Sequence, residues 1–374
     1  MKFTISSTAL CNRLQTLSRV ISNKNSLPIL ECILFELEGN QLRLTASDTD
    51  ITLITEMEVN DCEGGGRFAI NASKIINGIK EINEQPICII IDNDSFAVTI
   101  QYQNGAGNFI GQSGEEYPQP KGVNASAQSI VMDGNQLLGG VTRTLFATAD
   151  DELRPVMNGI FMDIQSESIT FVASDGHRLV KCRNFNVQGY QPASVILPKK
   201  PAKTLKEILG KGDGEVTMRF DESSAEIKLE GYTLSCTLIE GHYPNYNSVI
   251  PTDNPYRIIV DRQALIGALR RVMVFASSST SLVKLQIGGN TLSVSAQDID
   301  FATNAKESVL CEYDGAPMSI GFKGTFLIEI LNSLSSQEIA LELADPSRAG
   351  VICPVEEGSD EDVLMLLMPM MLND

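Results

Sequence analysis

The chain has 374 residues, more than one hydrophobic core usually organises, and this length predicts two or three domains. Apolar residues make up 43% of it and charged residues 20%, as is typical of a soluble globular protein, and no apolar run is long enough to span a membrane. The net charge of −18 disfavours phosphate-rich partners for the protein as a whole. The start, MKFTISSTALC, lacks the continuous apolar run of a signal peptide, so we expect a cytoplasmic protein with no membrane partner.

The predicted elements then repeat in the same order along the chain. Each copy opens with an apolar strand, which reads MKFTI, QSIVMD or YRIIVD. A helix follows each strand, and the three helices are expected over residues 6–22, 133–149 and 261–277. Their capping residues are expected to be Ser6 or Ser7, Asp133 and Asp261.

A hairpin follows each of these helices. Its second strand has a common pattern of apolar, any, apolar, any, Ala, any, Asp, at residues 42–48, 169–175 and 292–298. The alternation is typical of a half-buried strand, and aspartate favours the turn that ends it. Three related hairpins therefore predict three copies of one structural unit.

A second helix and two or three further strands complete each copy. These helices are expected over residues 71–82, 198–209 and 323–334. Asp48, Asp175 and Asp298 are separated by 127 and 123 residues, which sets the length of the repeat. The fold class is therefore α+β, with three tandem repeats of two helices packed on antiparallel sheets. Turn-forming segments place the boundaries so that the repeats are residues 1–124, 125–252 and 253–374.

The stretch FVASDGHRLV raises the possibility of catalysis. Ser174, Asp175 and His177 are the residue types of a hydrolase triad, and a hydrolase is one alternative function. The aspartate recurs in every copy, however, and no G-x-S-x-G motif accompanies the serine. The eight cysteines have no C-x-x-C spacing and His242 has no ligand partner at metal spacing, so we expect no catalytic residue, metal or cofactor.

Basic residues concentrate on the predicted helices. Arg19, Arg143 and Arg271 lie roughly opposite the apolar stripes of the three first helices, and several lysines belong to the second helices. One interpretation is an ordinary solvated face, which would fit a structural repeat protein with no role on DNA. The other is a positive surface, built by all three repeats, that attracts DNA phosphates without reading base sequence.

Several segments along the whole chain resemble one bacterial family. They are MKFTI at the start, LPIL at 27–30, SDGHRL at 174–179, YPNY at 243–246 and LLMPMML at 366–372. Together they resemble the DNA polymerase III beta subunit family, the sliding clamps of DNA replication. The resemblance implies a non-catalytic processivity factor, half of a closed ring per chain, with helices lining the hole and strands forming the outer wall.

The resemblance also implies the parts of that ring. Two chains would form a head-to-tail homodimer around double-stranded DNA, with repeats 1 and 3 in contact. The dimer-interface candidates are Phe109, Ile110, Val274 and Phe275. The residues expected to face DNA in the hole, called here the lumen candidates, are Arg19, Lys24, Lys74, Arg143, Lys199, Lys200, Lys203 and Arg271.

The same resemblance implies a pocket for short peptides of partner proteins. Its expected partners are the catalytic subunit of the replicative DNA polymerase, the clamp loader, and other polymerases and repair proteins. The residues of this partner pocket would be Met157, Ser174, Gly176, His177, Arg178, Leu179, Pro244, Val249, Leu366, Met368, Pro369 and Met370. Flexible methionines on apolar walls suit a peptide with leucine and phenylalanine anchors.

Overall fold

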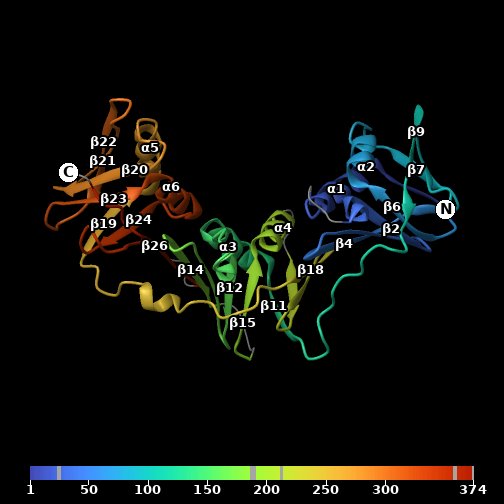
Figure 1. Cartoon of the computed structure of the whole chain (residues 1–374), viewed down its shortest axis with the longest axis horizontal. Coiled ribbons are helices and arrows are strands. Elements are labelled where there is room, and N and C mark those ends of the chain that lie inside the picture. Colours follow the sequence, from blue (N-terminus) through green and yellow to red (C-terminus); the bar gives the residue numbers. More distant parts are fainter. Residues whose placement is uncertain (23–26, 186–190, 211–213, 357–359, 373–374) are drawn as a thin grey trace. The chain divides into compact units, whose positions relative to one another are not determined.

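A computed structural model describes residues 1–22, 27–185, 191–210, 214–356 and 360–372 (Figure 1). Its contacts divide the chain into two compact units. The first unit is Met1–Asn135 with Lys203–Leu238, and the second is Gln136–Ala202 with Ile239–Asp374. Each unit therefore contains a terminal third of the sequence together with part of the middle third.

The first unit contains a five-stranded antiparallel sheet that begins with the N-terminal strand. Its strands, in spatial order, are β5 (Asn60–Glu63), β1 (Lys2–Ser6), β7 (Pro86–Ile91), β8 (Ala97–Tyr102) and β9 (Gly105–Ile110). Phe3, Ile5 and Ile89 are buried and alternate with half-buried residues, as the period of two predicts. β9 ends the sheet, so one of its edges has no strand partner among the described residues of the unit.

The first unit also contains a nine-stranded antiparallel sheet. Its order is β10 (Gln112–Ser113), β6 (Gly66–Asn71), β2 (Cys32–Glu38), β3 (Gln41–Ser47), β4 (Ile51–Glu58), β18 (Tyr232–Thr237), β17 (Ser224–Leu229), β16 (Glu215–Phe220) and β11 (Gln128–Asp133). β4 pairs with β18 from Ile51↔Cys236 to Ile54↔Thr233. We call this β4–β18 contact the first joint, because it links strands of the first and second sequence repeats.

Two helices and most of a third belong to this unit: α1 (Ser7–Ser18), α2 (Ala72–Ile79) and α4 (Lys199–Leu209). Ser6 caps α1, because its hydroxyl accepts the backbone N–H of Ala9 at 3.1 Å. Leu10, Leu14 and Leu17 are fully buried, which confirms the predicted apolar stripe. α1 and α2 pack against each other, side by side in Figure 1.

The second unit is built around a twelve-stranded antiparallel sheet. Its order is β15 (Ala193–Pro198), β12 (Gly159–Ile164), β13 (Ile169–Ser174), β14 (Arg178–Asn184), β26 (Glu361–Leu367), β25 (Gly350–Pro354), β24 (Glu338–Leu343), β19 (Tyr256–Asp261), β22 (Thr303–Glu312), β21 (Thr291–Asp298), β20 (Leu282–Gly288) and β23 (Met318–Lys323). β14 pairs with β26 from Arg178↔Leu367 to Asn184↔Glu361. This β14–β26 contact is the second joint, since it links strands of the second and third sequence repeats.

Most of α3 (Gly134–Thr144), together with α5 (Arg262–Met273) and α6 (Gly324–Ser333), belongs to the second unit. Asp261 caps α5 by accepting the N–H of Ala264 at 2.7 Å, as predicted. Gly140 lets α3 approach β13 closely, because an added Cβ would lie 2.4 Å from the ring of Phe171. All six predicted helices are therefore present.

The first helix of each repeat ends earlier than the sequence predicts, whereas α4 ends at Leu209 as predicted. α1 ends at Ser18, and the N–H groups of Arg19, Val20 and Ile21 each bond a carbonyl three residues earlier. Such tighter turns satisfy the last carbonyls of a helix that would otherwise lack partners. The apolar spacing in the sequence extends past Ser18 because these 3₁₀ turns keep nearly the same face of the chain inward.

The repeated aspartates have one shared structural role. Asp48, Asp175 and Asp298 each accept two backbone N–H groups, from the residues two and three positions later, at 2.8 to 3.2 Å. This geometry is an Asx turn that ends the second strand of each hairpin. The sequence prediction of a turn in all three copies is confirmed.

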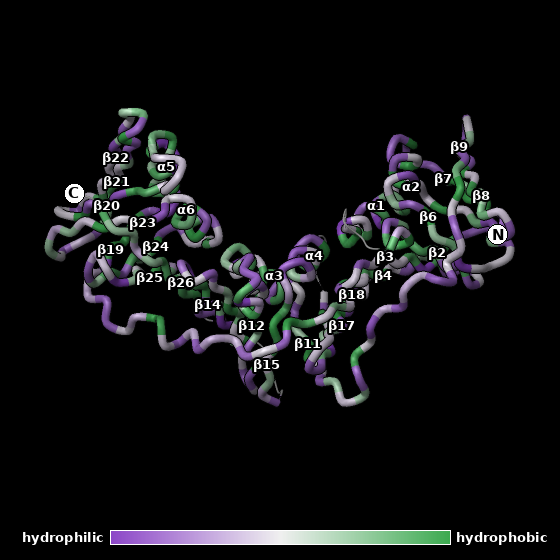
Figure 2. Tube along the Cα trace, in the orientation of Figure 1, coloured by the Kyte–Doolittle hydropathy of each residue, from purple (hydrophilic) through white to green (hydrophobic). Residues whose placement is uncertain are grey.

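The connections between elements are more polar than the strands. In Figure 2 the segment between β10 and β11 is mostly hydrophilic, whereas β12 and β20 contain clear apolar stretches. Among the described residues, no helix combines the length and apolarity needed to cross a bilayer. All eight cysteines are free thiols, and five of them are buried.

Candidate functional site

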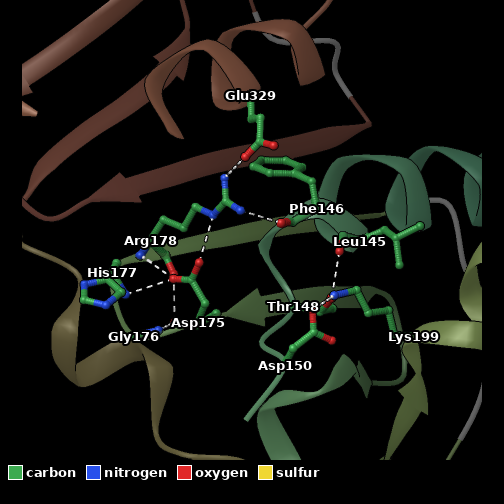
Figure 3. Close-up of polar contacts among 11 residues, drawn as sticks. Leu145, Phe146, Thr148, Asp150, Asp175, Gly176, His177, Arg178, Lys199 and Glu329 are labelled. Atoms are coloured by element: carbon green, nitrogen blue, oxygen red, sulfur yellow. Dashed lines mark hydrogen bonds and ion pairs between the residues drawn. The ribbon is translucent and has the colours of Figure 1, made fainter. Parts of the chain in front are cut away.

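The turn between β13 and β14 does not have the geometry of a catalytic triad. The Ser174 hydroxyl donates to the carbonyl of Arg178 at 2.8 Å, and Asp175 accepts the backbone N–H of His177. The imidazole of His177 points away from the Asp175 carboxylate (Figure 3). Gly176 supports the turn with a φ of +88°, a conformation that favours glycine. These side chains therefore build a turn, with His177 exposed on it.

Arg178 lies beneath this turn and is only 7% exposed. Its Nε donates to the Asp175 carboxylate at 3.1 Å and its Nη2 to the carbonyl of Phe146 at 2.7 Å, while Nη1 forms an ion pair with Glu329 (Figure 3). The guanidinium carbon lies 4.1 Å from the ring centre of Phe326. Each guanidinium nitrogen thus has an acceptor in the protein, and Arg178 supports the turn between β13 and β14 from beneath.

The C-terminal tail has two distinct parts. Met365, Leu366 and Leu367 are buried within β26, which is the core strand that apolar composition favours. Met368 then leaves the strand, donates its N–H to the carbonyl of His177 at 2.8 Å, and is 43% exposed. Met370 donates to the carbonyl of Gly321 at 2.8 Å. The tail therefore lies between the turn of β13–β14 and the strand β23.

An apolar cluster connects several predicted pocket residues. Leu179 lies opposite Leu366 in the second joint, and both are buried in a cluster with Val172 and Ala349. The YPNY segment covers it: Tyr243 stacks on Phe161 with ring centres 4.8 Å apart. Burial raises the pKa of Tyr243 above its ordinary value.

The other predicted pocket residues differ in position and exposure. Met157 lies in a 3₁₀ turn, Pro155–Met157, that precedes the hairpin strand β12, and it is buried. Pro155 starts the turn because its fixed φ favours a first helical position. Pro244, next to Tyr243 in the chain, is exposed, and Val249, at the end of the 3₁₀ turn Tyr246–Val249, is 57% exposed.

Sequence reasoning missed a contribution from α6. The ring centre of Phe326 lies 6.5 Å from that of His177, and the Nζ of Lys323 lies 4.2 Å from the Phe326 ring. Lys323 and Phe326 lie at the start of α6, a helix for which the sequence indicates only an apolar face. No spacing in the sequence connects this helix to a turn about 150 residues earlier, so local pattern could not have found the contact.

The lumen candidates differ in how much of their charge is available. Four of them form ion pairs: Arg19 with Glu207, Arg143 with Glu361 at 2.6 Å, Lys199 with Asp150 at 2.6 Å, and Arg271 with Glu307 at 2.5 Å. In the described part of the chain, Lys74 and Lys203 are exposed and have no carboxylate within ion-pair distance. Lys200 is half-buried, and Lys24 lies outside the described residues.

Arg143 is the most enclosed of the four ion-paired cations. Its side chain is 19% exposed and also contacts the thiol of Cys182. Burial lowers the pKa of Arg143, but the hydrogen bond and charge of Glu361 outweigh this and raise it. Arg143 therefore contributes to the second joint more directly than to an open surface, and it does not stand on the solvated face that the helical pattern suggested.

The dimer-interface candidates lie in different units. Phe109 and Ile110 belong to the edge strand β9, where Ile110 is 72% exposed. Val274 and Phe275 directly follow α5 and are 78% and 41% exposed. Exposed apolar side chains next to open sheet edges are suited to burial against another protein.

Three domain descriptions match the chain in succession. They are the N-terminal domain of the DNA polymerase III beta subunit at residues 1–120, its central domain at 132–245 and its C-terminal domain at 247–371. The chain belongs to the DNA polymerase III beta subunit family. The resemblance expected from the sequence motifs is thereby confirmed.

Individual members of this family match the chain over its full length. The chain is 27% identical to a Beta sliding clamp of Pseudomonas aeruginosa and 26% identical to one of Haemophilus influenzae, with all of each chain covered. The solved sliding clamp of P. aeruginosa bound to griselimycin has a TM-score of 0.92 at 25% identity, again with both chains fully covered. The beta subunit of Streptococcus pyogenes has the same fold, with a TM-score of 0.92.

Family membership settles the coarse function. The chain has three clamp-type domains and is a DNA sliding clamp of bacterial replication, as the sequence motifs predicted. The family is a non-catalytic processivity factor, so the chain is not an enzyme. The hydrolase and the purely structural repeat protein are not supported.

Proposed function

We propose that two copies of the chain close head to tail into a ring around duplex DNA and hold the replicative polymerase on its template. The observation that carries this proposal is a pair of open sheet edges in the two terminal thirds of the sequence. β9 ends its sheet in the first unit. In the second unit β22 pairs with β19 at Cys311 and Glu312, and its segment 303–310 has β21 as its one strand partner among the described residues.

Open edges of similar length favour pairing between copies. A contact between β9 of one copy and β22 of the next joins two different surfaces, and two copies close it into a ring. Phe109 and Ile110 would then pack near Val274 and Phe275 of the other copy. Within β9 no side chain is charged, which keeps the desolvation penalty of this edge small.

The lumen candidates would supply the DNA contacts. Contacts with phosphates do not depend on base sequence, and a protein that encloses DNA needs only weak ones. Lys74 and Lys203 are exposed for this role, while Arg19, Lys199 and Arg271 would exchange their carboxylate partners for phosphates. A positive hole also reconciles DNA binding with the net charge of −18.

The partner pocket would bind short peptides of the replicative polymerase, the clamp loader and other polymerases and repair proteins, one at a time. Support comes from the exposed Met368, which bonds the carbonyl of His177, from the exposed Val249, and from the buried pair Leu179 and Leu366. Flexible, polarizable methionines adapt to different apolar anchors. We further propose the cytoplasm as location and the repeat boundaries 1–124, 125–252 and 253–374.

Comparing how well the protein is retained on circular and on linear DNA tests whether it encloses the duplex. The protein should be loaded on nicked circular DNA by the clamp loader, and the retained fraction measured by gel filtration before and after one restriction cut. An enclosing ring stays on the circle and slides off the linear product. Equal retention on both forms would contradict the proposed ring and indicate ordinary surface binding.

A further inference from the structure

Arg178 connects the partner pocket to the third sequence repeat. Arg178, Asp175 and Phe146 belong to the second sequence repeat. Glu329 and Phe326 belong to α6 in the third repeat. The guanidinium carbon lies 5.0 Å from the ring centre of Phe146 and 4.1 Å from that of Phe326. One side chain therefore holds the pocket turn, the end of α3 and the start of α6 together.

This contact is specific because the charge is buried. A guanidinium that leaves water is tolerated only where every polar group finds a partner in good geometry. Arg178 meets that condition through Asp175, Glu329 and the carbonyl of Phe146. Glu329 is 50% exposed, so it is the partner that solvent can replace first when the contact opens.

The same contact belongs to a closed circuit of interactions around the pocket. Asp175 holds the backbone of His177, and the carbonyl of His177 accepts the N–H of Met368. Met370 in turn bonds Gly321 of β23, and β23 leads directly into α6. From α6, Glu329 returns to Arg178. Opening one link in such a circuit weakens the constraint on the neighbouring links.

We propose that Glu329 is a positioning residue for partner binding, which acts through Arg178 on the turn 174–179, and that pocket occupancy and the Arg178–Glu329 contact stabilise each other. This inference rests on the partner pocket proposed above. Coupling is reciprocal: if loosening the contact weakens peptide binding by some factor, a bound peptide must tighten the contact by the same factor.

Peptide affinity of matched variants tests the inference. The probe is a fluorescein-labelled decapeptide with one leucine and one phenylalanine anchor, titrated with the intact dimer and followed by fluorescence anisotropy. Glu329→Gln is expected to weaken binding about tenfold. Glu207→Gln is the control, because it breaks the Arg19–Glu207 pair at the first joint in the same way and should leave affinity unchanged.

Hydrogen exchange separates positioning from general destabilisation. In the wild type the peptide should slow exchange of the α6 amides at residues 328–331, and this protection should be lost in Glu329→Gln. Equal peptide affinity of Glu329→Gln and wild type, or unchanged protection of α6, would overturn the inference. Failure of the wild type itself to bind the probe would instead contradict the proposed partner pocket.

Discussion

The two joints use the same pairing of antiparallel strands but differ in what lies beside it. At the first joint β4 and β18 share four residue pairs, and the neighbouring Arg19–Glu207 pair is exposed, with 47% of the arginine side chain accessible. At the second joint β14 and β26 share seven pairs, and the side chain of Arg178 is only 8% exposed. Both joints therefore combine strand pairing with an ion pair, and the arginine beside the second joint is far less exposed.

The difference in burial indicates that the second joint has the more strictly defined geometry. Buried ion pairs contribute little net stability but penalise any arrangement that leaves the charge without partners. The second joint has such a buried ion pair next to the turn and tail that we propose as the partner pocket. The first joint carries no predicted partner site, and its arginine remains in contact with solvent.

The largest expected effect concerns the outer edges, which no strand of the same unit covers. Phe275→Asp should place a charge in the contact between copies and raise the dimer dissociation constant by roughly 1,000-fold, about 4 kcal/mol. Sedimentation velocity at low micromolar concentration should then show monomers. Leu153→Asp, at a side chain that is 92% exposed, is the matched control and should remain dimeric. A dimeric Phe275→Asp variant would remove this residue from the interface.

The joints themselves should respond unequally to loss of their arginines. Arg178→Met removes the cation that pairs with both Asp175 and Glu329, and should lower the free energy of unfolding by about 3 kcal/mol. Arg19→Met breaks an exposed pair and should lower it by less than about 1 kcal/mol. Urea denaturation of both variants measures the contrast, and equal losses would show that the two joints are equivalent.

These differences also show what a sequence can predict. Period-two and period-3.6 patterns found the hairpins and helices, and the caps at Ser6 and Asp261 followed from local chemistry. The role of Arg178 could not be found in this way, because Glu329 lies 151 residues later in the chain. Burial and ion pairing are set by such long-range contacts, so they escaped both the residue pattern and the resemblance.

A smaller effect is expected from the lysines of α4. Replacing Lys199, Lys200 and Lys203 together by Gln should shorten residence on closed circles and flatten the slope of log K against log salt by about 2. The expected change is less than one per lysine, because Lys199 already pairs with Asp150. Lys228→Gln, on the strand β17, is the control. An unchanged salt slope would place the three lysines outside the DNA-facing surface.

The smallest effect concerns an exposed ion pair near the end of α5. A hydrogen bond from Arg271 lowers the pKa of Glu307 below its ordinary value. The pair therefore stabilises the folded protein above about pH 4.5, and this contribution disappears as the pH falls through the lowered folded-state pKa. Melting temperatures of wild type and Glu307→Gln should differ slightly at pH 7 and converge near pH 3. A difference that persists at pH 3 would assign Glu307 another role.

Placement of the partner pocket at the second joint is tested most directly by removing the tail. A variant that ends at Leu367 keeps β26 and both dimer edges but loses Met368, Pro369 and Met370. Its affinity for the fluorescein-labelled decapeptide, measured by fluorescence anisotropy on a dimer verified by sedimentation, should fall below detection. Wild-type affinity in the truncated dimer would contradict the assignment and leave the turn Ser174–Leu179 with a structural role only.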